Sequence, residues 1–285
     1  MNELAAWVAD PFTYPFMQRG LGAALIVGSV VPILGTYVVL RGMAFFGDAL
    51  AHIVLPGVVV SFLLGWPLAV GALIVGVLAA LAVGLISDRT AIRQDTAIGV
   101  IFAGGFALGV ALISLQRSYA VDLAHILFGN LLGVSQADLL LMSVLAATVL
   151  LTIALLYKEF LILSFDRVLA RTMQLPVALL NNLLLVLLAV VIVISVQVVG
   201  VALVLAMLVT PPAAAMLFTR RLSTMMFASG VIGSFSGIAG LYLSFYGGVA
   251  SGPAIVLVAT AVFGLAFLLA PGRGVLRSRV RADPA

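Results

Sequence analysis

The sequence contains no cysteine, a single lysine and two histidines, and only 8% of its 285 residues are charged. Without cysteine there are no disulfide bonds and no thiolate metal ligands, which leaves Asp, Glu and His for binding a metal ion. Soluble domains carry about 25% charged residues, so this composition excludes an ordinary soluble domain. The one lysine, Lys158, does not follow a glycine-rich loop, so the chain lacks a Walker A motif, and no HExxH zinc-protease motif occurs.

Long apolar runs fill the chain instead, which is 64% hydrophobic with a mean hydropathy of +1.33. The expected fold class is all-α: a polytopic helical membrane protein with one transmembrane domain over residues 1–285. Residues 1–17 are expected to form an interfacial lead-in and residues 272–285 a basic cytoplasmic tail. Windowed hydropathy predicts nine spans, near residues 19–40, 43–64, 67–87, 96–115, 137–157, 178–196, 199–219, 224–245 and 253–271.

The placement of the basic residues predicts the orientation. If the N-terminus is outside, twelve basic residues lie on the cytoplasmic side and only Arg19 and Arg117 lie outside. Cytoplasmic loops carry the excess of Lys and Arg, so this asymmetry favours an outside N-terminus, a cytoplasmic C-terminus and an odd number of spans. The twelve are Arg41, Arg89, Arg93, Lys158, Arg167, Arg171, Arg220, Arg221, Arg273, Arg277, Arg279 and Arg281. The small net charge of +4 gives no reason to expect nucleic-acid binding.

Each histidine follows an aspartate by about one helical turn, and the first such pair is Asp48 and His52. A carboxylate and an imidazole on one helix face can both reach a divalent cation, and ionisable groups in a bilayer usually mark a substrate path. A helix counted from Arg41 puts Asp48 about 10 Å and His52 about 16 Å deep, near the midplane. Pro56 is expected to loosen this helix. The alternative is a structural hydrogen bond between the two side chains.

The second pair, Asp122 and His125, lies between the fourth and fifth predicted spans, in a segment too short to cross the membrane. We expect an interfacial or re-entrant helix on the outside. The pair is a candidate for an outer metal path, but helix capping by Asp122 with an exposed histidine explains it equally well.

Residues 158–177 are expected to form a cytoplasmic coupling loop. Asp166 is placed to cap a short amphipathic helix that runs to Gln174 and is closed by Pro176. An apolar stripe of Phe165, Leu169 and Met173, rimmed by charge, favours docking of a cytoplasmic partner, with a helix lying on the membrane surface as the alternative.

Three further patterns concern the packing of the spans. The double proline Pro211-Pro212 is expected to interrupt or kink the seventh span. Asn181 is expected to make hydrogen bonds between helices, and Asp138 to lie in the N-cap region of the fifth span. The recurring glycines are expected at close helix contacts.

Several stretches resemble the permease subunits of bacterial metal-cation ABC importers of the manganese, zinc and iron type, and most closely the manganese members. They are residues 41–57 (RGMAFFGDALAHIVLPG), 95–99 (DTAIG), 122–130 (DLAHILFGN), 164–166 (SFD) and 197–201 (QVVGV). The similarity extends from about Phe16 to Leu269. Gln174 departs from the glycine common in related permeases, and Tyr246-Gly-Gly-Val lacks an acidic residue that relatives often carry.

The resemblance implies a permease in the bacterial inner membrane that is not itself an enzyme and needs no cofactor of its own. Its partners would be a second permease copy, cytoplasmic ATPase subunits that bind ATP and an extracytoplasmic metal-binding protein. Asp48 and His52 would line the path of the transported ion, expected to be Mn²⁺ with Zn²⁺ or Fe²⁺ as alternatives. The residues expected to couple to the ATPase are Phe165, Asp166, Arg167, Leu169, Ala170, Met173 and Leu175.

Two other classes compete with this interpretation. A stand-alone secondary transporter or metal channel would be expected to carry more intramembrane carboxylates than Asp48 alone. A membrane enzyme would need several convergent polar groups at one depth, and the sequence offers too few.

Overall fold

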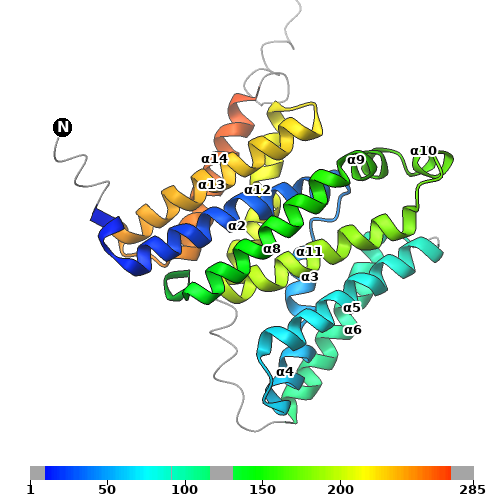
Figure 1. The fold of residues 1–285 in the computed structure, drawn as a ribbon, viewed down its shortest axis with the longest axis horizontal. Coiled ribbons are helices and arrows are strands. Elements are labelled where there is room, and N and C mark those ends of the chain that lie inside the picture. The colour runs from blue at the N-terminus through cyan, green and yellow to red at the C-terminus, as the bar shows by residue number, and fades with distance from the viewer. Residues whose placement is uncertain (1–9, 91, 116–130, 271–285) are drawn as a thin grey trace, which may run out of the picture. The chain divides into compact units, whose positions relative to one another are not determined.

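The computed structural model describes residues 10–90, 92–115 and 131–270, and every regular element in these ranges is a helix (Figure 1). Within them, nine helical stretches are long and apolar enough to cross a membrane, which confirms the predicted spans. They are α2 (Pro15–Leu40), α3 with α4 (Phe46–Ile53 and Leu55–Leu64), α5 (Leu68–Arg89), α6 (Gln94–Ser114), α8 (Gln136–Leu155), α11 (Val177–Val199), α12 (Val201–Phe218), α13 (Leu222–Gly247) and α14 (Ser251–Leu269). The short elements are η1 (Asp10–Thr13), η2 (Leu131–Gly133), α9 (Tyr157–Phe165) and α10 (Arg167–Thr172).

The chain divides into two compact units: residues 1–39, 130–143 and 198–285 in the first, and 40–129 and 144–197 in the second. In the first unit, α12, α13 and α14 pack on one another, and α2 meets α13 at Gly28 and Gly233. In the second unit, α3, α4, α5 and α6 pack together, and α11 approaches α5 where Asn182 lies over Gly84. Small residues at these contacts allow backbones to approach closely, as expected for helices in a membrane.

The seventh span is not interrupted by its double proline. Pro211 and Pro212 both lie inside α12, which is continuous from Val201 to Phe218. Pro212 has no N–H to donate to the Leu208 carbonyl, and Gly35 of α2 lies directly against that oxygen. A neighbouring helix therefore packs directly on the carbonyl that the proline leaves without its usual donor, at a position where only glycine fits.

The break between the sixth and seventh spans depends on one glycine. Gly200 has φ +89° and ψ 160°, a backbone conformation that is essentially restricted to glycine. It separates α11 from α12, so the two spans are distinct helices rather than one long helix. This break supports the count of nine among the described residues.

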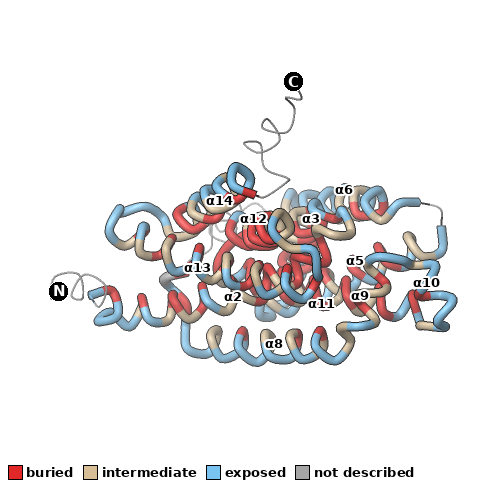
Figure 2. Tube along the Cα trace, turned by 90° about the horizontal axis from the view of Figure 1, so that it is seen from above, coloured by how far each residue is buried: buried red, intermediate tan, exposed pale blue. Residues whose placement is uncertain are grey.

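Helix α8 begins with a reciprocal cap and is exposed over most of its length (Figure 2). The Asp138 amide donates to the Ser135 hydroxyl, and the Ser135 amide and hydroxyl donate to the Asp138 carboxylate. Ser135 is thus the N-cap and Asp138 the third helical residue of a capping box, which confirms that Asp138 lies in the N-cap region. The exposed side chains of α8 are mostly apolar, as expected of a helix that meets lipid.

Candidate metal path and coupling surface

Helix α3 places Asp48 and His52 on one face, as the spacing predicts. The His52 ring nitrogen Nδ1 lies 2.9 Å from the Asp48 backbone oxygen and 3.7 Å from its Oδ1. A carbonyl oxygen can only accept, so Nδ1 is the donor in this contact, and Nε2 is the ring nitrogen that can face a cation. The side chains of Asp48 and His52 remain 40% and 31% exposed. A carboxylate and an imidazole nitrogen are thus available to a cation on the same face.

The second predicted span is not one helix. Residues 41–45 form turns, α3 begins at Phe46, and Val54 separates α3 from α4. The depths predicted for Asp48 and His52 assumed a helix starting at Arg41, and that assumption is wrong because the helix begins at Phe46; the depths themselves stay predictions. Pro56 lies in the first turn of α4 and has no N–H to donate to the His52 carbonyl. The hydrogen bond that the proline removes is the one to His52, so its effect falls at the junction between α3 and α4.

Two phenylalanines of α6 flank the histidine. The ring centroid of His52 lies 6.0 Å from that of Phe102 and 5.8 Å from that of Phe106, both with edge-on geometry. Phe45, which precedes α3, makes an edge contact with Phe102 at 5.4 Å. These aromatic contacts restrict the orientation of the imidazole. The only sequence signal for them is that Phe102 and Phe106 are one helical turn apart.

Glycines of α6 allow α3 and α4 to approach closely at this point. A Cβ on Gly105 would lie 3.2 Å from Cγ2 of Ile53, the residue after His52. A Cβ on Gly109 would lie 2.9 Å from the side chain of Leu55, at the start of α4. Both glycines therefore confirm the expected role in close packing. Gly99 and Gly104 of the same helix face open space, so that explanation is wrong for them within this chain.

Over the residues that the structure describes, Asp48 and His52 have no third metal-binding side chain beside them. No group of three or more His, Cys, Asp or Glu residues occurs in these ranges. Asp122 and His125, the candidate outer path, lie outside the described residues. The described part of the chain thus supplies two side-chain ligands at this place.

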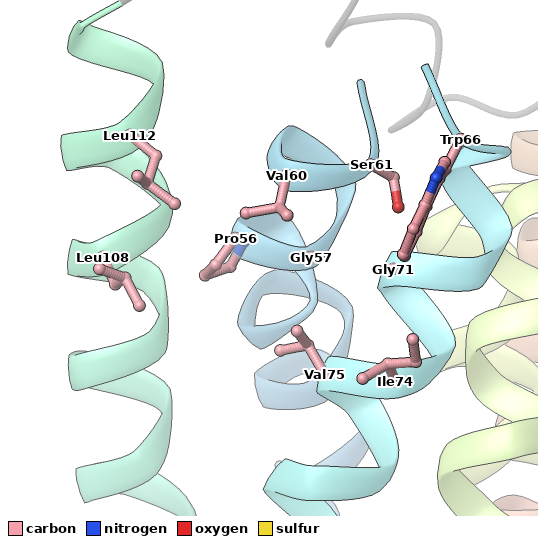
Figure 3. A pocket seen from close by; sticks show the side chains of 10 residues that line it. All are labelled: Pro56, Gly57, Val60, Ser61, Trp66, Gly71, Ile74, Val75, Leu108 and Leu112. Carbon is pink, nitrogen blue, oxygen red and sulfur yellow. The ribbon is translucent and has the colours of Figure 1, made fainter. Parts of the chain in front are cut away.

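A cavity of about 390 Å³ lies beyond His52, between α4, α5 and α6 (Figure 3). Figure 3 shows Pro56 and Val60 of α4 opposite Leu108 and Leu112 of α6, with Trp66 at its side. No charged group or imidazole lines it, so it does not provide ligands for a divalent cation.

The predicted coupling loop, which we now call the coupling segment (residues 157–177), contains two helices rather than the one predicted. Residues 157–165, interpreted as part of a loop, form α9, in which Phe160 and Leu163 are buried. Asp166 then caps α10, and its Oδ1 accepts from the amides of Val168 and Leu169 at 2.8 and 2.9 Å. The predicted cap is confirmed.

The predicted apolar stripe of Phe165, Leu169 and Met173 is exposed in this chain, with Phe165 at 65%. Val168, which is not among the residues predicted for coupling, is exposed even further, at 73%. Ala170 is fully buried and so lies on the inner side of α10, not on the stripe. The spacing of three to four residues identified the stripe, but it gave no sign of Val168, the second residue of α10.

Gln174 ends α10 in the left-handed conformation, with φ 57°. Its amide donates to the Arg171 carbonyl at 3.0 Å, and the Leu175 amide donates to the Ala170 carbonyl at 3.0 Å. This pair of bonds is the Schellman arrangement, whose left-handed position usually holds glycine. The departure noted at Gln174 therefore keeps the helix ending and places a residue with a Cβ in a strained backbone conformation.

Residues 13–270 match the sequence model of the ABC 3 transport family. The chain belongs to that family. It is 44% identical to "Manganese transport system membrane protein MntC" of Halalkalibacterium halodurans, over 97% of this chain and 94% of that protein. It is 40% identical to "Chelated iron transport system membrane protein YfeD" of Yersinia pestis, over 94% of this chain and 90% of that protein.

A solved structure has the same fold as this ABC 3 family member. "PsaBC from Streptococcus pneumoniae in complex with Fab" matches with a TM-score of 0.83 and 39% identity, over 97% of this chain and 99% of that chain. The expected ABC permease fold and the multi-pass location in the bacterial inner membrane are confirmed. Family membership also decides between the competing classes, in favour of the ABC permease and against the stand-alone transporter. The orientation of the termini and the roles of individual residues stay predictions.

Proposed function

We propose that this ABC 3 permease carries Mn²⁺ across the membrane and that Asp48 and His52 bind the ion on its way. The support comes from the manganese-named relatives and from the shared face of the two side chains on α3. Carboxylate and imidazole ligands suit Mn²⁺ and also Fe²⁺ and Zn²⁺, so the residues by themselves do not select the metal.

Two exposed ionisable side chains on a transmembrane helix need cover. Facing lipid, a carboxylate costs about 3 kcal/mol or more at the bilayer centre, so such groups usually face a partner helix or a water-filled path. Asp48 and His52 are about one-third exposed, and no third ligand accompanies them in the described ranges. A second copy related by a two-fold axis would cover this face and complete a set of two carboxylates and two imidazoles. The two carboxylates would balance the charge of the divalent ion.

Energy for uptake would come from a separate ATPase, because the chain contains no nucleotide-binding motif. The exposed stripe of Phe165, Val168, Leu169 and Met173 is the docking surface that we propose for it. An extracytoplasmic metal-binding protein would deliver the ion to the opposite side. In this scheme, docking and ATP hydrolysis alternate the access of the Asp48–His52 site between the two sides.

The test is uptake of radioactive Mn²⁺ by cells that carry the permease variants Asp48→Asn and His52→Ala. Each should reduce uptake to background while the protein stays folded in the membrane, as judged by a monodisperse gel-filtration peak in detergent. Asp138→Asn is the matched control, because it makes the same chemical change at a helix cap and keeps a capping oxygen. Purified wild-type permease should bind one Mn²⁺ per two chains. Wild-type uptake by both variants, or a loss of folded protein without a specific transport defect, would contradict the proposed ligands.

A further inference from the structure

The coupling segment is hydrogen-bonded to the helix that flanks His52. Arg167, the first residue of α10, donates from its guanidinium to Oε1 of Gln94 at 3.0 Å. Gln94 is the first residue of α6, the helix that carries Phe102 and Phe106 beside His52. Phe102 lies eight residues further along α6, about 12 Å at 1.5 Å per residue. Because a helix moves as a stiff element over this length, a displacement at Gln94 reaches the two rings.

A second connection runs from the end of α9 to the turn before α3. Arg41 donates from Nε to the Ser164 hydroxyl at 3.3 Å and from a guanidinium nitrogen to Oδ1 of Asn181 at 2.9 Å. Asn181 is fully buried, and its amide nitrogen lies 3.5 Å from both carboxylate oxygens of Asp88. We call these four residues the Arg41 network. Through this network Ser164, which precedes Phe165, is bonded to Arg41, which lies seven residues before Asp48.

The two connections differ in kind from the docking stripe. The stripe is apolar and exposed, so it can hold a partner but has no directional contacts of its own. The Arg167–Gln94 bond and the Arg41 network are partly buried, and each includes a guanidinium donor. Charge-assisted hydrogen bonds are strong and geometrically specific, and a low dielectric makes them costlier to break. Such bonds make the elements they join move together, whereas apolar surfaces can slide.

We propose that the Arg167–Gln94 bond and the Arg41 network transmit movement of the coupling segment to the Asp48–His52 site. Arg167, Gln94, Arg41 and Ser164 are then positioning residues for transport, since none of them needs to touch the ion. The inference depends on the proposed docking of an ATPase on α9 and α10. Docking would then act on Asp48 and His52 from two sides: through α6, which begins at Gln94, and through the turn at Arg41 that precedes α3.

The experiment measures Mn²⁺ ions taken up per ATP hydrolysed, in proteoliposomes that hold the permease with its co-purified ATPase. Arg167→Met and Gln94→Leu should each lower this ratio about fivefold to tenfold, within the range of ordinary coupling between sites. The double variant should be no worse than the more severe single variant, because both remove the same bond. Gln94→Glu keeps an acceptor for Arg167 and should restore a ratio close to that of the wild type.

Arg171→Met is the matched control, because it removes the same charge from the same helix at an exposed position. It should leave the ratio unchanged. ATPase co-purification should be normal with all of these variants, which separates transmission from docking. If no ATPase co-purifies with the wild type, the proposed function fails. If the ATPase is present but Arg167→Met and Gln94→Leu keep the wild-type ratio, only the transmission proposal fails.

Ser164→Ala tests the Arg41 network without altering a charge. It removes the acceptor of the Arg41 Nε bond and leaves the bond to Asn181 in place. A lowered ratio with unchanged melting temperature supports the proposal, and an unchanged ratio removes the network from it. Gln94→Leu decides the outcome for α6 if Arg167→Met does not fold, because Gln94 lies at a helix end and is only partly buried.

Discussion

Phe165→Ala should weaken docking of the ATPase by about two orders of magnitude if the exposed stripe is the docking surface. Phe165 ends α9, directly before the Asp166 cap, and 65% of it is exposed in this chain. A phenylalanine can bury about 150–250 Å², so complete docking would cover about 100–160 Å² of this residue. At about 25 cal/mol per Å², that area corresponds to about 3 kcal/mol. The dissociation constant would then rise about 150-fold.

The assay is a titration of detergent-purified permease with the purified ATPase, read out as the dissociation constant. The melting temperature of Phe165→Ala should equal that of the wild type, since the side chain packs little within this chain. Thr172→Ala is the control, because Thr172 is exposed like Phe165 but is polar and ends α10; it should change the dissociation constant less than twofold. Phe165→Asp, which places a charge in the contact, should bind more weakly than Phe165→Ala. A dissociation constant for Phe165→Ala within twofold of the wild type would refute docking on this stripe.

Four other outcomes follow from particular backbone and surface positions. Gly200→Ala should lower the free energy of unfolding by about 1–3 kcal/mol, because alanine is strained at φ +89°; an unchanged melting temperature would contradict the assigned break. Gln174→Gly should raise the free energy of unfolding by about 0.5–1 kcal/mol, because the relief of left-handed strain exceeds the entropy cost of a glycine. A lower melting temperature would show that the Gln174 side chain has a role of its own. Ala51→Cys lies between Asp48 and His52 in this cysteine-free chain, so mild oxidation should link two copies; a product that stays monomeric would argue against the two-fold arrangement. An impermeant thiol reagent added outside should label Val249→Cys and spare Ser223→Cys, and the reverse result would overturn the orientation predicted from charge.

Local signals account for what the sequence predicted well. Hydropathy located all the spans that the structure describes, because each span must satisfy its own backbone within one apolar run. The capping roles of Asp138 and Asp166 were predictable for a similar reason, since the groups that their carboxylates accept from lie two or three residues away. The one-turn spacing of Asp48 and His52 likewise fixes their shared face before any tertiary contact is known.

The features that escaped prediction depend on contacts between distant segments. Arg41 finds its partners 123 and 140 residues further along the chain, and no local pattern identifies them. Phe102 and Phe106 become relevant only once α6 packs beside His52. Helix α9 was interpreted as a loop because its sequence mixes charged and apolar residues, and burial of Phe160 by the surrounding chain favours the helix.

The hydrogen bonds of the second unit also bear on the orientation, independently of hydropathy. They join the turn at Arg41, the end of α5, the start of α6, the end of α9, the start of α10 and the start of α11, so these parts of the second unit lie together. That same end carries Arg41, Arg89, Arg93, Lys158, Arg167 and Arg171, whereas the α4–α5 turn at residues 65–67 has no basic residue. The basic end of this unit is therefore also the end that presents the exposed apolar stripe. If the stripe docks a cytoplasmic ATPase, as proposed, it must lie on the cytoplasmic side, and the positive-inside rule predicts the same side for this end from charge alone.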